Sequence, residues 1–471
     1  MRVSIGRAVV AIALALALIA PATASGNPAP GAVLDPSFGD GGVLRLPAED
    51  AFTAYGASAR AGRLLVGGGH GVQVLDRRGH LDRGFGGDGS LNLPSAAGSR
   101  FAPRAVAVDP RGRLLVVGDS VFPESENPSP PLGNGLPVFT PEVVRILRFL
   151  PDGKLDPTFG QGGVVETDLG LPPPVGTKGE TLGPHPSIQA TGIAVSPEGQ
   201  IVVTGAAVVG LGEACEHDIF SAVGSSAAWV ARFTGSGAAD PGFGSDGLVG
   251  GHEMAENPLG ATVVGEPVVG PDGGITYRST GVDRCDRGSS HFGIARLTPA
   301  GQTDPGFGRD GAFVGFFTAL ASGPGGSLFA LEQQFGGAKE PVKARVLRVA
   351  ADGRLDRGFG HHGRATVRLG RSQTTTLDAL AVDGRGRILV GGTIGARKGH
   401  SIALLRVSAR GRWEQGFGPH GRVATPVRQL ARSGPTDLFF DARGRVVVLS
   451  RYENQQTRHD GLVVARYLLQ S

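Results

Sequence analysis

The chain alternates short apolar runs with turns that contain glycine, proline or aspartate, and this pattern predicts β-strands. The run AVAV from Ala105 is followed by a DPRG turn and a second apolar run that ends near Gly118. Two apolar runs around such a turn predict a β-hairpin. The same arrangement begins again at Ile193, Leu380 and Leu438. No segment after the first residues keeps helical spacing, so we predict an all-β protein.

A rigid nine-residue motif separates these hairpins and occurs seven times. Its copies begin at Leu34, Leu81, Leu155, Ala239, Thr303, Leu355 and Trp413, with the form LDPSFGDGG in the first. Successive motif phenylalanines lie between 47 and 84 residues apart, so the material between the copies varies in length. A short apolar strand follows each motif, and another precedes the next one, for example RILRF from Arg145. This pattern predicts four strands in each unit, and the motif is expected to link the fourth strand of one unit to the first strand of the next.

Repetition of this unit predicts a single seven-bladed β-propeller of four-stranded antiparallel blades over residues 34–471. One four-stranded unit cannot bury both of its faces, whereas units arranged around an axis bury each sheet against its neighbours. A β-solenoid is the alternative, but its coils are shorter and more regular in length. We expect the ring to close through the N- and C-termini. Arg466 in the last strand has no motif after it, and Asp35 in the first motif has no arginine-bearing strand before it.

The LDxxFGxxG motif followed by an apolar strand resembles the delta-60 repeat family, a bacterial β-propeller repeat. The resemblance covers nearly all of the chain after its leader, although the last copy has Trp413-Glu414 in place of Leu-Asp. It implies the propeller fold. It implies no activity, because the family has no established chemistry that could be transferred.

The first 24 residues have the features of a secretory signal peptide. Arg2 and Arg7 precede an apolar run over residues 8–20, and a small-x-small sequence ends at Ala24. A membrane anchor is the alternative, but the run is short for a span of roughly 20 residues. We therefore predict a secreted or extracytoplasmic protein with a short linker at 25–33, no lipid anchor and no transmembrane segment after cleavage.

Composition narrows the choice of partners. The 79 glycines and 33 prolines accompany 40% hydrophobic residues, which excludes a disordered chain. The net charge is +4, and removal of the leader leaves +2. This is too small to favour nucleic acid or an anionic membrane as a partner. Two tryptophans and four tyrosines argue against a sugar-stacking lectin. We expect a monomer without a cofactor.

An acid in most motifs lies eight residues after an arginine of the preceding strand, with a turn between the two. This register predicts structural ion pairs. The pairs are Arg148–Asp156, Arg232–Asp240, Arg296–Asp304, Arg348–Asp356 and Arg406–Glu414, with Arg466–Asp35 across the termini. Val74 occupies the arginine position in the first unit. A ring of carboxylates for calcium or catalysis is the alternative, but residues present in every unit favour a structural role. The motif aspartates suit Asx-turns, and the phenylalanines suit the gaps between blades.

Other chemistry is sparse. Cys215 and Cys285 are the only cysteines, and export favours a disulfide between them, with two free thiols as the alternative. His361, His362 and His420 fall in motif turns, but no third ligand accompanies them, so we predict no metal site. No nucleophile elbow, phosphate-binding loop or zinc-protease motif occurs, and no residue is predicted to be catalytic.

These observations predict a non-catalytic binding or scaffold propeller whose ligand or protein partner is unknown. An extracytoplasmic propeller enzyme of glycosidase, lyase or lactonase type and a structural cell-surface or adhesion component are the alternatives. The long connections are expected on the face opposite the motif turns, and insertions on one face often mark a binding side. Polar candidates there are Glu213, His217, Asp283, Arg284, His291, Arg397, His400, Tyr452 and His459.

Overall fold

The structure, a computed structural model, describes fifteen segments of the chain that together form antiparallel β-sheets. They are residues 31–47, 55–58, 62–68, 71–95, 99–121, 141–172, 187–211, 224–250, 262–283, 289–334, 343–368, 376–396, 399–430, 437–453 and 460–470. The helical elements that can be followed in these segments are the short 3-10 turns η2 (Pro324–Gly326) and η3 (Pro419–Gly421), and Gly62 also lies in a 3-10 turn. The predicted all-β class is confirmed.

Five of the seven sheets have the four antiparallel strands that the sequence predicts. They are β6 (Arg100–Val108), β7 (Leu114–Val121), β8 (Pro141–Phe149) and β9 (Val164–Thr167); β10 (Ser187–Val195), β11 (Ile201–Leu211), β12 (Gly224–Phe233) and β13 (Leu248–Gly250); β14 (Thr262–Val269), β15 (Ile275–Asp283), β16 (Ser289–Leu297) and β17 (Ala312–Val314); β18 (Phe317–Ser322), β19 (Leu328–Gln334), β20 (Lys343–Val349) and β21 (Arg364–Arg368); and β22 (Thr376–Val382), β23 (Ile388–Ala396), β24 (Gly399–Val407) and β25 (Val423–Val427).

The first and last sheets depart from this count. The sheet of β3 (Tyr55–Ser58), β4 (Leu64–Gly68) and β5 (Gly71–Leu75) has three strands. In place of a fourth strand, its outer edge carries isolated bridges, Gln73 with Ser90 and Leu75 with Leu81. The last sheet contains β26 (Asp437–Phe440), β27 (Val446–Glu453) and β28 (Asp460–Leu469) together with β1 (Ala32–Leu34) and β2 (Val43–Pro47). Both N-terminal strands pair with β28, so the two ends of the chain share one sheet.

The motif lies within a sheet, which corrects one prediction. The sequence suggested that it links one unit to the next. Instead, the motif from Leu155 joins β8 to β9, and these strands pair with each other through Leu147 and Val164. The backbone N–H of Asp156 donates to the carbonyl of Arg148, and left-handed glycines such as Gly163 reverse the chain. The links between sheets are therefore the segments that follow the outer strands. The motif and the short turn between β6 and β7 still share one end of the sheet.

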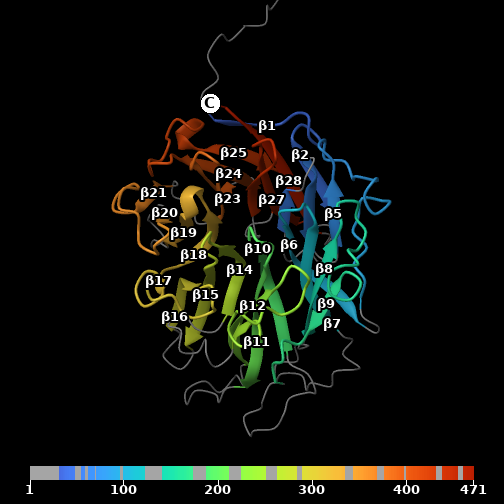
Figure 1. The fold of residues 1–471 in the computed structure, drawn as a ribbon. Helices are drawn as coiled ribbons and strands as arrows, with labels where there is room; N and C mark the ends of the chain where they lie inside the picture. Colours follow the sequence, from blue (N-terminus) through green and yellow to red (C-terminus); the bar gives the residue numbers. More distant parts are fainter. Residues whose placement is uncertain are drawn as a thin grey trace, which may run out of the picture.

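The first strand of each sheet lies toward the middle of the molecule. These inner strands contact one another in chain order, β3 with β6, β6 with β10, and onward to β22 with β26. The strand β26 in turn contacts β3. Figure 1 shows the sheets following one another around the centre, from blue through green and yellow to red.

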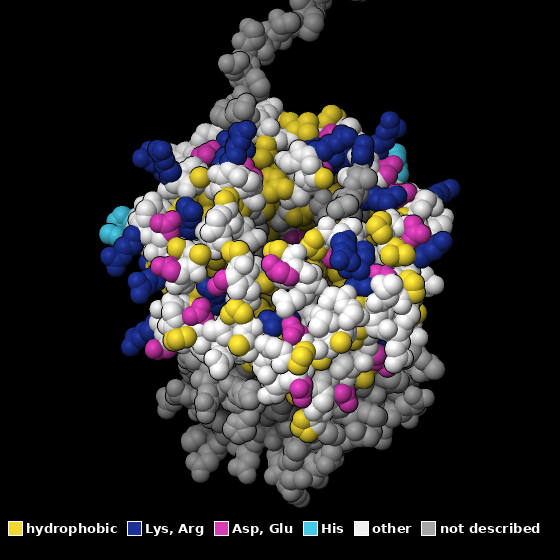
Figure 2. Space-filling view, in the orientation of Figure 1, with side chains coloured by type: hydrophobic (Ala, Val, Ile, Leu, Met, Phe, Trp, Pro, Cys, Tyr) yellow, Lys and Arg dark blue, Asp and Glu magenta, His cyan; other side chains and the backbone are white. Residues whose placement is uncertain are grey.

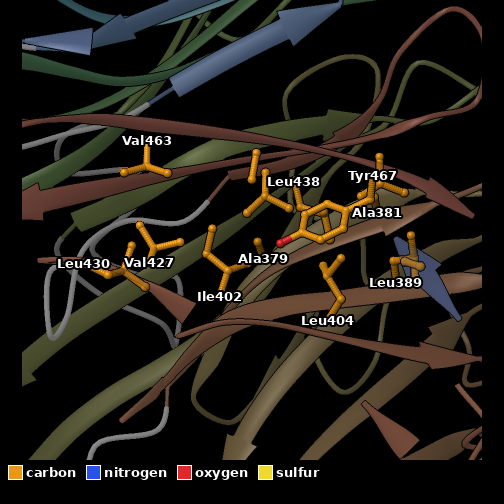
Figure 3. Close-up of a cluster of buried hydrophobic side chains, with 14 of the residues drawn as sticks. Ala379, Ala381, Leu389, Ile402, Leu404, Val427, Leu430, Leu438, Val463 and Tyr467 are labelled. Carbon is orange, nitrogen blue, oxygen red and sulfur yellow. The ribbon is translucent and has the colours of Figure 1, made fainter. Parts of the chain in front are cut away.

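Seven hydrophobic clusters among the described residues fill the spaces between neighbouring sheets. Each contains one motif phenylalanine, for example Phe159 between the sheets of β6 and β10. In the cluster of Figure 3, Ile402 and Leu404 of β24 face Leu438 of β26. The buried hydroxyl of Tyr467 in this cluster donates to Thr425 Oγ1 at 2.9 Å. The cluster around Phe38 joins β4 and β5 to β27 and β28, which belong to the first and last sheets.

Several predictions fall outside the described residues. These are the signal peptide at 1–24, most of the linker at 25–33, and both Cys215 and Cys285. Within the described segments, no helix is long and apolar enough to span a membrane.

Candidate functional site

The motif acid is bonded through both of its carboxylate oxygens. In the third copy, Asp156 Oδ1 accepts the N–H and the hydroxyl of Thr158 at 3.0 and 2.6 Å, which is an Asx-turn. Its Oδ2 accepts from Arg148 Nε at 2.9 Å. Burial acts to raise the pKa of Asp156, but the bonds from Thr158 and the charge of Arg148 outweigh it, and the pKa lies below its ordinary value. The carboxylate is held charged.

The structure brings together all six Arg–acid pairs of the sequence register. Their shortest N–O separations are 2.9 Å for Arg148–Asp156, 2.8 Å for Arg232–Asp240, 3.5 Å for Arg296–Asp304, 3.3 Å for Arg348–Asp356, 2.5 Å for Arg406–Glu414 and 2.9 Å for Arg466–Asp35. The arginine also reaches the next sheet, since Arg466 Nη1 donates to the carbonyl of Arg77 at 2.7 Å. Its guanidinium carbon lies 4.3 Å from the ring centroid of Phe38.

A second arginine also lies near the motif acid, and the sequence register did not predict it. In the first unit, where Val74 replaces the usual arginine, Arg63 Nε donates to Asp82 Oδ2 at 2.6 Å. Arg113 occupies the same place after its hairpin turn and lies 3.2 Å from Asp156. The Gly-Arg pair that recurs at the ends of the hairpin turns, as in Gly62-Arg63 and Gly112-Arg113, carries this signal. The motif acids therefore have partners within the protein, and they are not candidates for a ligand site.

The inner strands share a structural irregularity. Five of them carry a β-bulge, where the strand gains residues relative to its neighbour. The bulged residues are Arg104 on β6, Thr191 on β10, 265–267 on β14, Thr318 on β18 and Asp378 on β22. Bulges re-aim side chains and are common beside active sites. Unlike the motif, the bulges carry different side chains in different sheets.

Polar side chains join neighbouring sheets at the level of the bulges. Asp119 Oδ1 accepts the backbone N–H of Ala190 at 2.8 Å. Arg278 Nη1 donates to the carbonyl of Phe317 at 3.3 Å. Thr318 Oγ1 donates to the carbonyl of Leu377 at 2.8 Å. Each bond crosses from one sheet to the backbone beside the next bulge, so these residues fix the spacing of the inner strands.

Four charged residues at this level form what we call the channel cluster: Glu266 on β14, Arg278 on β15, Asp378 on β22 and Asp437 on β26. Glu266 lies on the largest bulge, where β14 advances four positions while β15 advances two. A Cβ added to Gly265 would lie 2.2 Å from Arg278 Nη2, so the guanidinium packs against the bulge. Within the described part of the chain, Glu266 makes no hydrogen bond or ion pair.

The electrostatics of the channel cluster are those of an enclosed site. Burial, reinforced by the charge of Asp437, raises the pKa of Glu266 to about 8 against the opposing charge of Arg278. Burial lowers the pKa of Arg278 to about 10 and raises the pKa of Asp378. By surface area, however, Glu266 is exposed and the other three side chains are half-buried, so all four reach solvent although the surrounding protein disfavours the charged form of Glu266. Side chains that touch solvent but are surrounded by protein are expected in a narrow channel.

Figure 2 shows a hollow near the middle of the molecule, with hydrophobic, acidic and basic side chains around it. The channel cluster lies toward one end of the inner strands. Asp378 and Asp437 are at or near the starts of β22 and β26, whereas the short turns follow the ends of these strands. The cluster is therefore displaced toward the face opposite the motif turns.

A fully buried acid lies at the same level on another sheet. Asp119 on β7 has no exposed surface, and Arg104 Nε donates to its Oδ2 at 2.6 Å. Burial raises the pKa of Asp119 to about 6 against the charge of Arg104 and the bond from Ala190. All of its partners are internal, so we regard it as a positioning residue for β6 and β10.

Sequence reasoning missed the channel cluster. The available signal was Arg278, which interrupts an apolar strand where other units have Val117 or Leu331. Of the polar candidates on the long connections, the structure describes only the side chains of His400 and Tyr452, both half-buried. The rings of His361 and His362 contact each other edge to face, with 4.3 Å between their centroids. Within the described segments, no three histidine, cysteine or acidic side chains are grouped so that they could bind a metal ion.

Comparison with family models gives one match. The family described as "Domain of unknown function (DUF5122) beta-propeller" matches residues 133–159 and 281–307. Each matched segment ends at a motif phenylalanine, Phe159 or Phe307. The repeated antiparallel sheets and this match together decide the architecture. The fold is a β-propeller.

Similarity to solved propeller structures is low. A protein of unknown function from Dyadobacter fermentans is 13% identical, with 81% of this chain and 98% of that chain covered and a TM-score of 0.44. Polysaccharide lyase Uly1 is 11% identical, with 89% and 90% covered and a TM-score of 0.44. The sialidase of Trypanosoma rangeli is 12% identical, with 92% of this chain but 59% of that chain covered and a TM-score of 0.43. These values carry no functional argument. No curated protein matches the chain.

Proposed function

We propose that this chain is an exported, non-catalytic binding propeller that holds a polar ligand at the channel cluster. The observation that carries the proposal is that the side chains at the level of the bulges differ from one sheet to the next. Glu266, Arg278, Asp378 and Asp437 lie on or beside inner strands, while the motif repeats with little change around the molecule. A repeated feature serves every blade alike, whereas a site for one ligand requires distinct side chains. The delta-60 repeat family remains the proposed relationship of the motif.

We further propose that seven blades form a ring closed by the chain termini. The pairing of β1 and β2 with β28, the contact of β26 with β3, and the cluster around Phe38 support this closure. Closure would surround the inner strands on all sides and create the enclosed setting of Glu266. The signal peptide at 1–24 and a disulfide between Cys215 and Cys285 belong to the same proposal, since both suit an oxidising compartment.

The chemistry of the cluster limits the ligand. Because its pKa is raised to about 8, Glu266 would retain its proton at neutral pH and could donate a hydrogen bond to a ligand, while Arg278 and Asp437 place charges of both signs nearby. Together they suit a ligand rich in both donors and acceptors, such as a hydroxylated or zwitterionic molecule. A bound ligand stabilises the fold, by about 2.7 kcal/mol at a hundred times its Kd.

The test is thermal stabilisation of the mature chain by three probe sets: neutral oligosaccharides, uronate oligosaccharides and short peptides. The proposal expects at least one probe to raise Tm in the wild type and to lose this effect in Asp378→Asn and Arg278→Met. Asp40→Asn, on the motif face, is the matched control and keeps the effect. Stabilisation that survives both channel variants, or no stabilisation by any set, would contradict the proposed site.

An enzyme is the second candidate, favoured by the protonated state of Glu266. A carboxyl group that retains its proton near neutral pH is suited to general acid catalysis, and Asp378 and Asp437 supply further carboxyl groups. This candidate predicts turnover of a chromogenic glycoside, a uronate polysaccharide or a lactone, which is lost in Glu266→Gln. Turnover that persists in Glu266→Gln, or none on these substrates, rejects it.

A further inference from the structure

The groove beside the sixth motif carries a concentration of positive charge. Its walls include His361 and Arg364 from the motif hairpin and Arg410 and Arg412 from the turn of the next blade, around a cavity of about 510 Å³. We call this the sixth-motif groove. It lies on the outer part of the blades, away from the channel cluster.

Backbone hydrogen bonds hold together the two segments that carry these residues. The N–H of Gly360 donates to the carbonyl of Arg410 at 2.9 Å, which ties the motif to the next blade. The N–H of His361 donates to the carbonyl of Arg364 at 2.8 Å, which closes the hairpin. Arg364 is half-buried, and Arg410 and Arg412 are exposed. Basic groups from two blades therefore border one cavity.

Other copies of this groove do not have the same charge. The first motif has the same backbone bond, from Gly39 to the carbonyl of Arg78 at 2.8 Å, but Asp40 and Val43 replace His361 and Arg364. The cavity there is lined by Arg45 and Arg428 together with the acid Asp40. The fifth motif has Asp352 where the sixth has Arg410. In the third motif, Gln161, Val164, Ser236 and Ala238 occupy the corresponding positions. The basic groove is thus a departure from the repeat and is not required by the fold.

The arginines of the groove have no internal counter-charge. Among the described residues, Arg364, Arg410 and Arg412 form no ion pair, whereas the motif arginines pair with an acid. Water screens the repulsion between these exposed charges, but together they make the cavity positive and attract an anion. The arrangement therefore fits an external anion.

We propose that the sixth-motif groove binds a phosphate-bearing ligand. Guanidinium groups match the geometry of phosphate oxygens, and several can contact one phosphate, which accepts more hydrogen bonds than a carboxylate. The cavity of about 510 Å³ exceeds the size of one phosphate and leaves room for a diphosphate or a phosphodiester segment. A small soluble diphosphate and a phosphodiester polymer share this chemistry. The proposal does not depend on the channel site.

The test is isothermal titration of the mature chain with pyrophosphate and with poly(glycerol phosphate) at low salt. The wild type is expected to bind at least one probe. Loss of one charge-assisted contact corresponds to about tenfold in affinity, so Arg410→Ser with Arg412→Ser should weaken binding by about a hundredfold. Both residues are exposed, so the variant should keep the wild-type Tm. Tighter binding of the polymer identifies a phosphodiester source, and tighter binding of pyrophosphate identifies a small diphosphate.

The matched control removes the same charge elsewhere. Arg111→Ser with Arg309→Ser alters two exposed arginines on other blades and should change the affinity less than twofold. Equal weakening in the two double variants would show attraction by net charge alone and would overturn the site. Absence of binding by both probes would overturn it as well.

Discussion

In several units one arginine side chain connects three parts of the fold, as Arg148 illustrates. Arg148 Nε bonds the motif acid Asp156, its Nη1 bonds the carbonyl of Gly235 in the next blade, and its guanidinium carbon lies 4.4 Å from the ring centroid of Phe159. Arg148 is only 2% exposed, so it is paired within the protein. Loss of one member of a buried pair leaves the other member charged and unpaired.

Arg148→Met is therefore predicted to destabilise the protein by about 3 kcal/mol. This value is at the lower end for a broken buried ion pair, because Arg113 still contacts Asp156 in the variant. Denaturant unfolding measures this loss. Arg111→Ala, an exposed arginine nearby, should change stability by less than about 0.5 kcal/mol. Equal effects of the two substitutions would contradict the role of the pair.

The same pair predicts a pH dependence. The pKa of Asp156 is lowered in the folded protein from 3.8, so its contribution is present above that pH and is lost as the pH falls through the folded pKa. The stability difference between wild type and Arg148→Met should accordingly shrink below about pH 4. A difference that stays constant down to pH 2 would mean that Asp156 does not titrate with the pair.

At the scale of the element, the motif turn depends on left-handed backbone at defined positions. Gly160 and Gly162 have φ of 52° and 63°. A Cβ on Gly160 would lie 2.2 Å from the carbonyl oxygen of Val164, whereas a Cβ on Gly162 would meet nothing within 4 Å. Asp246 and Asp310 occupy the position of Gly162 in other copies. This explains why the residue after each motif phenylalanine is always glycine, while the third residue varies.

Gly160→Ala and Gly162→Ala should therefore differ. Both place alanine in left-handed backbone, which costs about 1–2 kcal/mol. Only Gly160→Ala adds a clash with the backbone, and it should cost at least about 1 kcal/mol more. Thermal or denaturant unfolding of the two variants measures the difference. Equal stabilities would show that the turn relaxes without strain.

At the scale of the whole molecule, the proposed ring depends on the pairing of β1 and β2 with β28. Val33 and Leu468 lie opposite each other in this pairing and are 41% and 37% exposed. Opposed residues of antiparallel strands are separated by about 4.5–5.5 Å between Cα atoms, which suits a disulfide.

Val33→Cys with Leu468→Cys, in a chain with Cys215→Ser and Cys285→Ser, should oxidise to an intramolecular disulfide. The bond should raise stability by about 2–4 kcal/mol and be visible by non-reducing electrophoresis. Val33→Cys with Val314→Cys is the control, since both sites are exposed but β1 and β17 belong to different sheets. Persistent free thiols in the first pair, or disulfides only between molecules, would contradict closure.

The repeat made much of this fold predictable. The eight-residue register from Arg148 to Asp156 is local, so one turn was enough to predict their proximity. The partner of the strand after each motif was not predictable. A strand such as β9 has the same apolar sequence pattern whether it pairs with β8 in its own sheet or begins the next sheet. The channel cluster was hidden for a related reason. Glu266 and Asp437 are 171 residues apart, and only the packing of sheets brings their charges together.

The ionisation of Glu266 tests the account most directly, because it depends on both the ring and the channel cluster. The ¹³C NMR signal of its labelled carboxyl group, assigned by its loss in Glu266→Gln, reports the pKa. The account predicts a value of about 8. Because this pKa is raised, the ionised form destabilises the fold, and Glu266→Gln should match the wild type in Tm at pH 4 and exceed it at pH 9. A pKa near the ordinary value of 4.5 would place Glu266 on an open surface and contradict the enclosed channel.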